Sequence, residues 1–445
     1  MIRYRGLTVV FALLIGVAPA VAQAPLPLTL EAAISRGLAH APRLAEARAR
    51  EAAASSVVAS RAAARAPSIT ATGSYLRTNH IEPFGIPQPD GTVRPLFPDL
   101  PNNYRVRAEL GLPIFTSGRT EASVAFATEE LRAIEAEGEV VEADVRLDVV
   151  RAYWALVTAR ERVRVLGAEL DRMDAWVGDV RARVDAGFLP PNDILSARAQ
   201  RARQNVQLIQ ARQGASLAEI DLARLIGVDL DQPIDAVTPV DEPLGAAADA
   251  AAQPVDALVA LAREQRAERA GLLHRQEALR AAGEATLAAT RPQIAGLAAV
   301  EPSRPNPRFV PRSAEWRTSW DLGVIVTWPL FDGGRARADR AVSLAQAEAA
   351  GHRLDEFDAL VAVEIRQRLL DLEASRAALA AATEAVAAAS EARRVVGERF
   401  DAGVATSAEV LDAQTALLET ELERTQIAAA LRLGEARLLR AIGGL

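Results

Sequence analysis

The chain has 445 residues, no cysteine and a formal net charge of −7. The missing cysteines exclude disulfides, thiol catalysis and cysteine-based metal sites, and an acidic chain without a basic cluster argues against a nucleic-acid partner. Half of the residues are hydrophobic, but only 4% are aromatic, and alanine is abundant. Because alanine is the strongest helix former, this composition indicates a helix-rich chain.

The first residues have the layout of a secretory signal peptide. Arg3 and Arg5 precede an apolar stretch, residues 7–18, and Ala20-Val21-Ala22 forms a small-residue cleavage site. We predict a signal peptide over 1–22, with Gln23 as the new N-terminus. A permanent anchor is the alternative, but the apolar stretch is short for a membrane span of roughly 20 residues. No other segment has 18 apolar residues in a row.

The rest of the sequence contains one unit twice. A shift of 216 residues aligns Leu112-Pro113-Ile114-Phe115 with Trp328-Pro329-Leu330-Phe331, and Gly187 with Gly403. We assign a first repeat to 23–228, a linker rich in Pro, Asp and Ala to 229–254, and a second repeat to 255–445. Two long units are too few for a solenoid, so a duplicated half-barrel is the better interpretation.

Each repeat is predicted to hold the same elements in the same order. Thr29 is a candidate N-cap for a helix that runs to about residue 66. In the first repeat the later elements are strands at about 67–77 and 104–113, a long helix over 119–186 and a return helix over 191–227. In the second repeat they are a helix from 255, strands at about 292–300 and 319–329, a long helix over 335–402 and a return helix over 406–443.

The two long helices exceed the needs of a globular core. A helix over 119–186 would extend roughly 100 Å, whereas globular helices average about 11–12 residues. Its apolar positions are spaced 3 and 4 residues apart in turn, which drives left-handed supercoiling. These positions are Val163, Leu166, Leu170, Met173, Val177, Val180 and Val184. A plain soluble coiled coil explains the helix alone, but not the strands attached to it.

The strands alternate between apolar and polar residues. Tyr104, Val106 and Ala108 alternate with Arg105 and Arg107, a pattern that suits lipid on one face and water on the other. An ordinary half-buried sheet is the alternative. The aromatic residues Tyr104, Trp316, Trp320 and Trp328 are predicted to form an interfacial girdle.

Four strands cannot close a membrane barrel, and an open edge in lipid leaves backbone groups unpaired. Several copies must therefore share one barrel. Two copies would give eight strands and three would give twelve, and the residues alone do not choose between them.

Four features occur in a fixed order: the twofold repeat, the two strand ends quoted above, the Gly118-Arg119 and Gly334-Arg335 pairs that follow them, and the Gly187 and Gly403 turns. In these features the chain resembles the TolC family of outer-membrane efflux proteins. The resemblance covers nearly all of the chain after the leader. It implies a mainly α fold with a membrane β-barrel: a homotrimer in which each protomer gives four strands to a shared 12-stranded barrel, and long coiled-coil helices form a periplasmic α-barrel. It also implies an exit duct in the bacterial outer membrane that docks on a periplasmic adaptor protein and, through it, on an inner-membrane pump.

The hairpin turns are the expected docking end. Each glycine follows a long helix, where a left-handed residue is expected, and Thr406 with Glu409 has the spacing of a capping box. The first turn has Pro190 where the family has a small hydroxyl residue. We expect the tips to dock the adaptor through Gly187, Phe188, Pro190, Asn192, Gly403, Val404 and Thr406.

By position, Glu409 and Asp412 match the acidic residues that ring the periplasmic mouth in the family, and Asp193 is the first-repeat counterpart of Glu409. Such a ring would favour cations, although Glu409 is equally placed to cap its helix. The family's gate often pairs an aromatic with a basic residue, and those places hold Phe400 and Ala405. The resemblance therefore puts Glu409, Asp412, Asp193 and Phe400 at the pore constriction.

Nothing in the sequence indicates an enzyme. The histidines His40, His80, His274 and His352 are scattered without ligand spacing, and no nucleophile motif accompanies them. We predict no cofactor and no metal. The competing hypothesis is a secreted coiled-coil scaffold or adhesin without channel activity.

Overall fold

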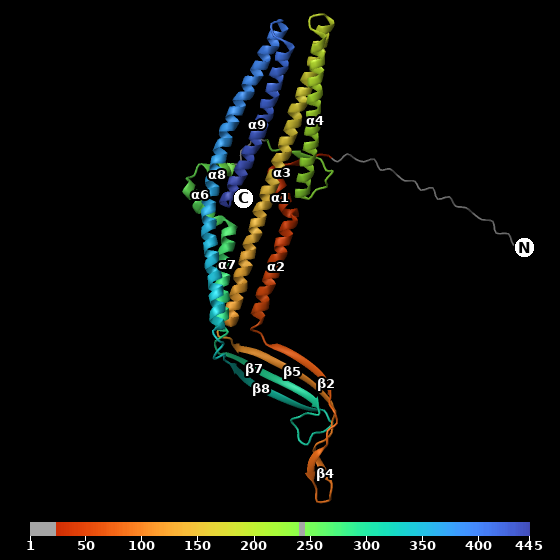
Figure 1. Cartoon of the computed structure of the whole chain (residues 1–445), viewed down its shortest axis with the longest axis vertical. Coiled ribbons are helices and arrows are strands. Elements are labelled where there is room, and N and C mark those ends of the chain that lie inside the picture. The colour runs from red at the N-terminus through yellow and green to blue at the C-terminus, as the bar shows by residue number, and fades with distance from the viewer. Residues whose placement is uncertain (1–23, 240–244) are drawn as a thin grey trace, which may run out of the picture. The chain divides into compact units, whose positions relative to one another are not determined.

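The computed structural model describes residues 24–239 and 245–445, so the predicted signal peptide lies outside the described residues. The chain is mainly helical, with strands attached to long helices (Figure 1). The predicted combination of long helices and a small sheet is therefore confirmed.

The elements follow the repeat. The first repeat contains β1 (Leu26–Leu28), α1 (Leu30–His40), α2 (Pro42–Ala63), β2 (Ser68–Arg77), β3 (Phe84–Pro87), β4 (Val93–Phe97), β5 (Asn102–Phe115), α3 (Arg119–Asp185) and α4 (Pro191–Ile226). Then come β6 (Ile234–Ala236), α5 (Gly245–Ala251), α6 (Val255–Gln265), α7 (Ala267–Ala288), β7 (Gln293–Arg304), β8 (Arg317–Thr327), α8 (Arg335–Asp401) and α9 (Ser407–Ile442). Both α3 and α8 have 67 residues.

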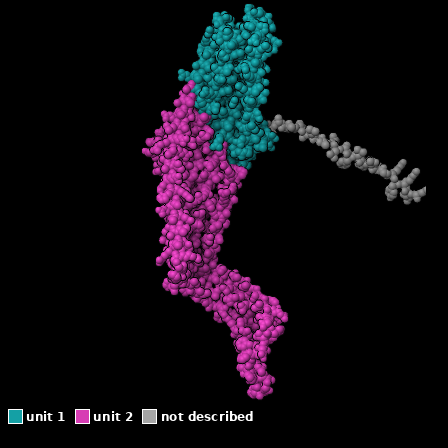
Figure 2. Space-filling model, viewed as in Figure 1, with its two compact units in different colours: residues 1–40, 149–242, 382–429 teal, residues 41–148, 243–381, 430–445 magenta. Residues whose placement is uncertain are grey.

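The chain divides into two compact units, which Figure 2 colours separately. Unit 1 contains residues 1–40, 149–242 and 382–429, and unit 2 contains 41–148, 243–381 and 430–445. Each unit takes segments from both sequence repeats, and α3, α8 and α9 contribute residues to both. The sequence repeats therefore do not coincide with the compact units.

Unit 1 is a bundle of helices joined to a short sheet. β1 pairs in parallel with β6, and the hydroxyl of buried Tyr153 links them: it donates to Leu28 O at 3.0 Å and accepts from Thr238 N at 3.0 Å. Farther along, Leu166 on α3, Leu208 on α4 and Leu418 on α9 pack in one apolar cluster. The 3–4 spacing of α3 thus buries its stripe against neighbouring helices.

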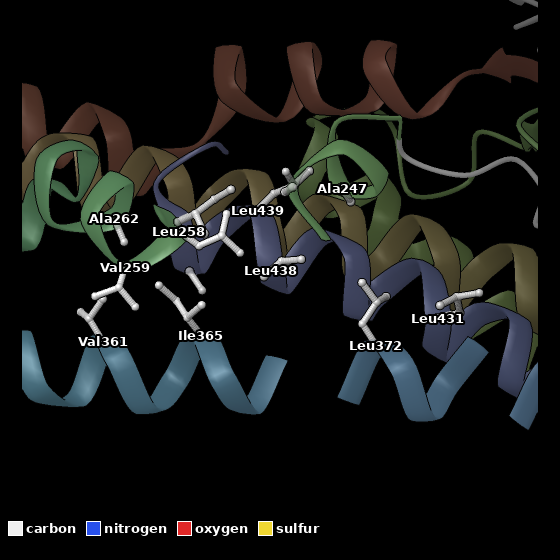
Figure 3. Close-up of a cluster of buried hydrophobic side chains, with 13 residues drawn as sticks. Ala247, Leu258, Val259, Ala262, Val361, Ile365, Leu372, Leu431, Leu438 and Leu439 are labelled. Atoms are coloured by element: carbon white, nitrogen blue, oxygen red, sulfur yellow. The ribbon is translucent and has the colours of Figure 1, made fainter. Parts of the chain in front are cut away.

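Unit 2 holds the four-stranded sheet and a large apolar cluster. The sheet is antiparallel, with the order β2-β5-β7-β8, so β2 and β8 are its edges. Figure 3 shows the cluster, in which side chains of α6, α8 and α9 meet. Its members include Leu258, Ile365 and Leu438, each fully buried.

A charged network lies in the helical part of unit 2. Arg440 binds Glu268 at 2.7 Å and Asp144 at 3.0 Å, and Arg266 binds Glu268 at 3.0 Å and Glu364 at 2.6 Å. Burial alone would raise the pKa of Glu268, but hydrogen bonds from Arg266 and Arg440 lower that pKa to about 2. The network therefore stays ionised at neutral pH and joins α3, α7, α8 and α9.

Three features differ from the sequence expectation. The helix expected over 29–66 is broken at Ala41, because Pro42 lacks the N–H that would continue it and instead begins α2. The second repeat breaks at the matching Arg266, which is extended (φ −73°, ψ 117°) without a proline. The proline-rich loop contains the hairpin β3–β4, and the linker expected over 229–254 contains β6 and α5.

Candidate functional site

The two helical hairpins turn in the same way. After α3, Gly187 has φ 79°; its N–H donates to Val184 O at 2.9 Å, and Phe188 N–H donates to Arg183 O at 2.8 Å. After α8, Gly403 has φ 74°; its N–H donates to Phe400 O at 3.0 Å, and Val404 N–H donates to Arg399 O at 2.9 Å. This pair of bonds is a Schellman motif, which needs a left-handed residue and so favours glycine.

The return helices start differently. α9 begins with the predicted capping box: Thr406 N–H donates to Glu409 Oε2 at 2.6 Å, and Glu409 N–H donates to Thr406 Oγ1 at 3.3 Å. These bonds, the backbone one first, hold the pKa of Glu409 below its ordinary value. α4 begins after Pro190, with Pro191 in its first turn and no side-chain cap.

Most of the residues predicted at the tips are exposed. Phe188 is 81% and Val404 65% exposed, and Pro190, Asn192, Thr406, Glu409 and Asp412 are exposed as well. Asp193 is half-buried. Phe188 and Val404 therefore place one exposed apolar side chain beside each glycine turn.

Phe400, which the resemblance places at the constriction, is buried in unit 1. It is 3% exposed, and its ring lies 4.7 Å from that of Trp176 on α3. The guanidinium of Arg183 lies 4.5 Å from the centre of the Phe400 ring and binds Asp401 at 2.5 Å. A tilted aromatic contact and a cation–π contact therefore join the two hairpins inside unit 1.

A buried polar cluster in unit 1 was missed by the sequence analysis. Glu169 is fully buried; it accepts from Arg172 Nε at 2.7 Å and from Gln204 Nε2 at 3.5 Å. Burial raises the pKa of Glu169. Arg172 also lies 3.7 Å from Glu421 on α9. The available signal was a Glu–Arg pair three residues apart beside the apolar stripe of α3.

The sheet has one charged face. Strand register places Arg105, Arg107 and Glu109 of β5 on the same side as Glu301 of β7 and Asp321 of β8. Arg107 contacts Glu109, Glu301 and Asp321 at 3.0, 3.2 and 3.3 Å. These cross-strand ion pairs join three of the four strands on that face.

The other face is apolar and exposed. Val106, Leu110, Leu322, Val324 and Val326 all lie on it and are exposed. A single-sided sheet of this kind would be unstable if both faces met water. The alternation predicted for lipid on one side and water on the other is therefore present in three dimensions.

Aromatic residues gather at one end of the apolar face. The ring centres of Tyr75 and Tyr104 are 5.0 Å apart, and those of Tyr104 and Trp316 are 6.0 Å apart. Trp320 and Trp328 are exposed but lie outside this cluster, Trp328 just beyond the other end of β8. Tyr75 joins the predicted group because β2 pairs it with Tyr104, which only the register reveals.

Within residues 24–239 and 245–445, the structure groups no three His, Cys, Asp or Glu side chains in a metal-binding arrangement. In the same residues, no helix combines the length and apolar character that crossing a membrane requires.

The comparisons with known proteins agree with these features. A family model described as outer membrane efflux protein matches residues 33–228 and 258–444. Protein CyaE of Bordetella pertussis is 28% identical over 345 residues, which cover 75% of this chain and 69% of CyaE. Outer membrane efflux protein BepC of Brucella suis is 27% identical over 331 residues, which cover 73% of this chain and 69% of BepC.

Solved structures share the fold. The outer membrane protein VceC of Vibrio cholerae superposes with a TM-score of 0.74 at 20% identity, over 93% of this chain and 96% of VceC. The open state of the outer membrane channel MtrE of Neisseria gonorrhoeae gives a TM-score of 0.73 at 19% identity, over 93% of this chain and 89% of MtrE.

Proposed function

Because the chain belongs to the outer membrane efflux protein family, we propose that it is one protomer of a trimeric exit duct. The duct receives substrates from an inner-membrane pump and passes them across the periplasm and the outer membrane. The chain is an outer membrane protein with a large periplasmic helical part. No catalytic step is assigned to it.

The open sheet carries this proposal. β2 and β8 are edges, and each leaves a row of backbone N–H and C=O groups without partners, which lipid cannot satisfy. Pairing of β8 from one copy with β2 of the next removes every edge once the ring closes. With four strands from each copy, three copies give twelve strands, and the charged face lines the lumen while the apolar face meets lipid.

Exposed apolar stripes on the helices support assembly. On α4, Val206, Ile209 and Leu217 lie on an exposed side, opposite the buried Leu208 and Ala211. On α8, the apolar Leu360, Val363 and Leu370 are likewise exposed. A helix with apolar residues on two sides requires a partner on each. Helices of adjacent copies are the proposed partners.

We assign two roles to the hairpin tips. The exposed apolar side chains Phe188 and Val404, with the glycine turns beside them, dock the periplasmic adaptor protein. The exposed carboxylates Glu409 and Asp412, with Asp193 from the other hairpin, form a negative ring at the periplasmic mouth. Glu409 also caps α9, so it has both roles.

Membrane assembly is tested by purifying the protein from outer membranes in detergent. The expected species migrates as a large oligomer on gels without heating and as a monomer after boiling, and it forms ion-conducting pores in planar bilayers. A secreted scaffold would instead stay in buffer without detergent and would form no pore.

Docking is tested by inserting a bulky peptide after Gly187 or after Gly403. Export of a substrate should stop, while heat-modifiable migration persists. The matched control inserts the same peptide after Gly91, in the turn between β3 and β4, where export should continue. Continued export by the tip insertions would remove the docking role.

A further inference from the structure

The segment Asn306–Arg312, between β7 and β8, is folded onto the charged face of the sheet. Asn306 is 3% exposed, and its Nδ2 donates to Ser319 Oγ at 3.1 Å and to Arg317 O at 3.0 Å. Arg308 binds the Asp321 carboxylate and donates to Trp320 O at 3.0 Å. Because Ser319 and Asp321 point to the charged face by strand register, this end of the segment lies over that face.

The other end of the segment reaches the hairpin that connects β2 with β5. Arg312 N–H donates to Leu96 O at 3.0 Å, and the Arg312 guanidinium lies 5.1 Å from the centre of the Phe97 ring. In Figure 1 the loop between β7 and β8 lies beside this hairpin, at the end of the sheet away from the helices. The segment is therefore anchored at both ends, to β8 on the charged face of the sheet and to the β3–β4 hairpin.

The width of the proposed barrel determines how much of its mouth such a segment would fill. Twelve strands spaced about 4.8 Å apart and tilted by roughly 40° enclose a barrel about 24 Å across, measured between backbones. A chain segment packed on the inner face adds roughly 10 Å of thickness. Three such segments, one from each copy, would occupy most of the mouth.

We propose that Asn306–Arg312 forms a second constriction, at the outer end of the barrel, which restricts the size of the solutes that pass. The inference rests on the proposed trimeric duct. Arg308 acts as a positioning residue, because its bond to Asp321 holds the segment against the wall. Val310, in the middle of the segment, is 61% exposed, and the proposal places it toward the lumen.

The cysteine-free sequence permits a direct test. Val310→Cys introduces a single thiol, and Val93→Cys on β4, where the side chain is 58% exposed, is the matched control. Each purified channel is inserted in planar bilayers, and its single-channel conductance is measured before and after reaction with a bulky methanethiosulfonate. Modification at 310 should lower the conductance roughly twofold or more, and modification at 93 should leave it unchanged.

Cross-linking gives a second readout that does not depend on which constriction dominates the current. A short-spacer bismaleimide should join Val310→Cys protomers into covalent dimers and trimers, but should leave Val93→Cys protomers single. Complete modification at 310 without cross-links and without a change in conductance overturns the inference. If the unmodified protein forms heat-modifiable oligomers and pores in the same experiment, the proposed duct survives that result.

Discussion

The two hairpin tips reach one geometry through different chemistry. Both long helices end in a Schellman turn at a glycine with positive φ. The first return helix then starts from the fixed φ of Pro190 and Pro191, whereas the second starts from the hydrogen bonds of Thr406 and Glu409. Proline stiffness does not depend on pH or on a side-chain partner, but a carboxylate cap depends on both. The start of α9 at the second tip should therefore respond to pH, whereas the start of α4 at the first tip should not.

The largest expected difference between the hairpins lies at Phe400 and its first-repeat counterpart, Val184. Phe400→Ala removes a buried ring that contacts Trp176 and Arg183, and should destabilise the packing of unit 1 by about 3–5 kcal/mol. Val184→Ala, at a half-buried site, should cost roughly 1 kcal/mol. Hydrogen exchange of the last turns of α3 and α8 measures both. Equal effects would show that the contact between the Trp176 and Phe400 rings does not join the hairpins.

The next largest difference in stability is expected at the capping box. Thr406→Ala removes the acceptor for Glu409 N–H and should destabilise the first turn of α9 by about 1 kcal/mol. Asn192→Ala, in the first turn of α4, should change local stability by less than about 0.5 kcal/mol, because that helix has no side-chain cap. Amide exchange in the two first turns compares them. If Asn192→Ala destabilised the first turn of α4 as much as Thr406→Ala destabilises that of α9, the two helices would not differ in side-chain capping.

The stability of the second tip should depend on pH more than that of the first. The pKa of Glu409 is lowered in the folded chain, so its stabilising contribution is present above its ordinary pKa of 4.5 and is lost as the pH falls through the lower, folded value. The first turn of α9 should therefore fray in acid. A pH series of amide exchange checks this. Thr406→Ala should weaken the dependence, and an identical dependence in the first turn of α4 would exclude the cap as its cause.

Ion selectivity gives the smallest expected effect. Replacing both carboxylates of the second tip, with Glu409→Gln and Asp412→Asn, should reduce the cation-to-anion permeability ratio roughly twofold. Asp193→Asn, at a half-buried site, should reduce it less. Reversal potentials in a salt gradient provide the measurement. Unchanged selectivity in the double variant would leave helix capping as the only role of Glu409.

The features with strong local signals could be predicted from the sequence. The helix expected over 119–186 is observed as Arg119–Asp185, because glycine on each side and an unbroken apolar stripe define it. The strand expected over 104–113 extends over Asn102–Phe115. Thr406 and Glu409 form the capping box that their spacing predicts.

Features that depend on long-range contacts could not be predicted. β1 pairs with β6 more than 200 residues away, and no local pattern marks either three-residue strand. Arg266 breaks its helix while it binds Glu268 and Glu364, where the first repeat uses a proline. Phe400 is buried because Trp176 lies opposite on another helix. The family resemblance, which placed Phe400 at the pore constriction, carries no information about this contact.

The number of copies in the duct tests the central claim most directly. Light scattering of the detergent-solubilised protein, with the detergent mass subtracted, should give three times the mass of one chain after loss of the predicted leader. Three copies supply the twelve strands that remove both open edges, β2 and β8. A single chain that stays monodisperse in buffer without detergent would contradict the account.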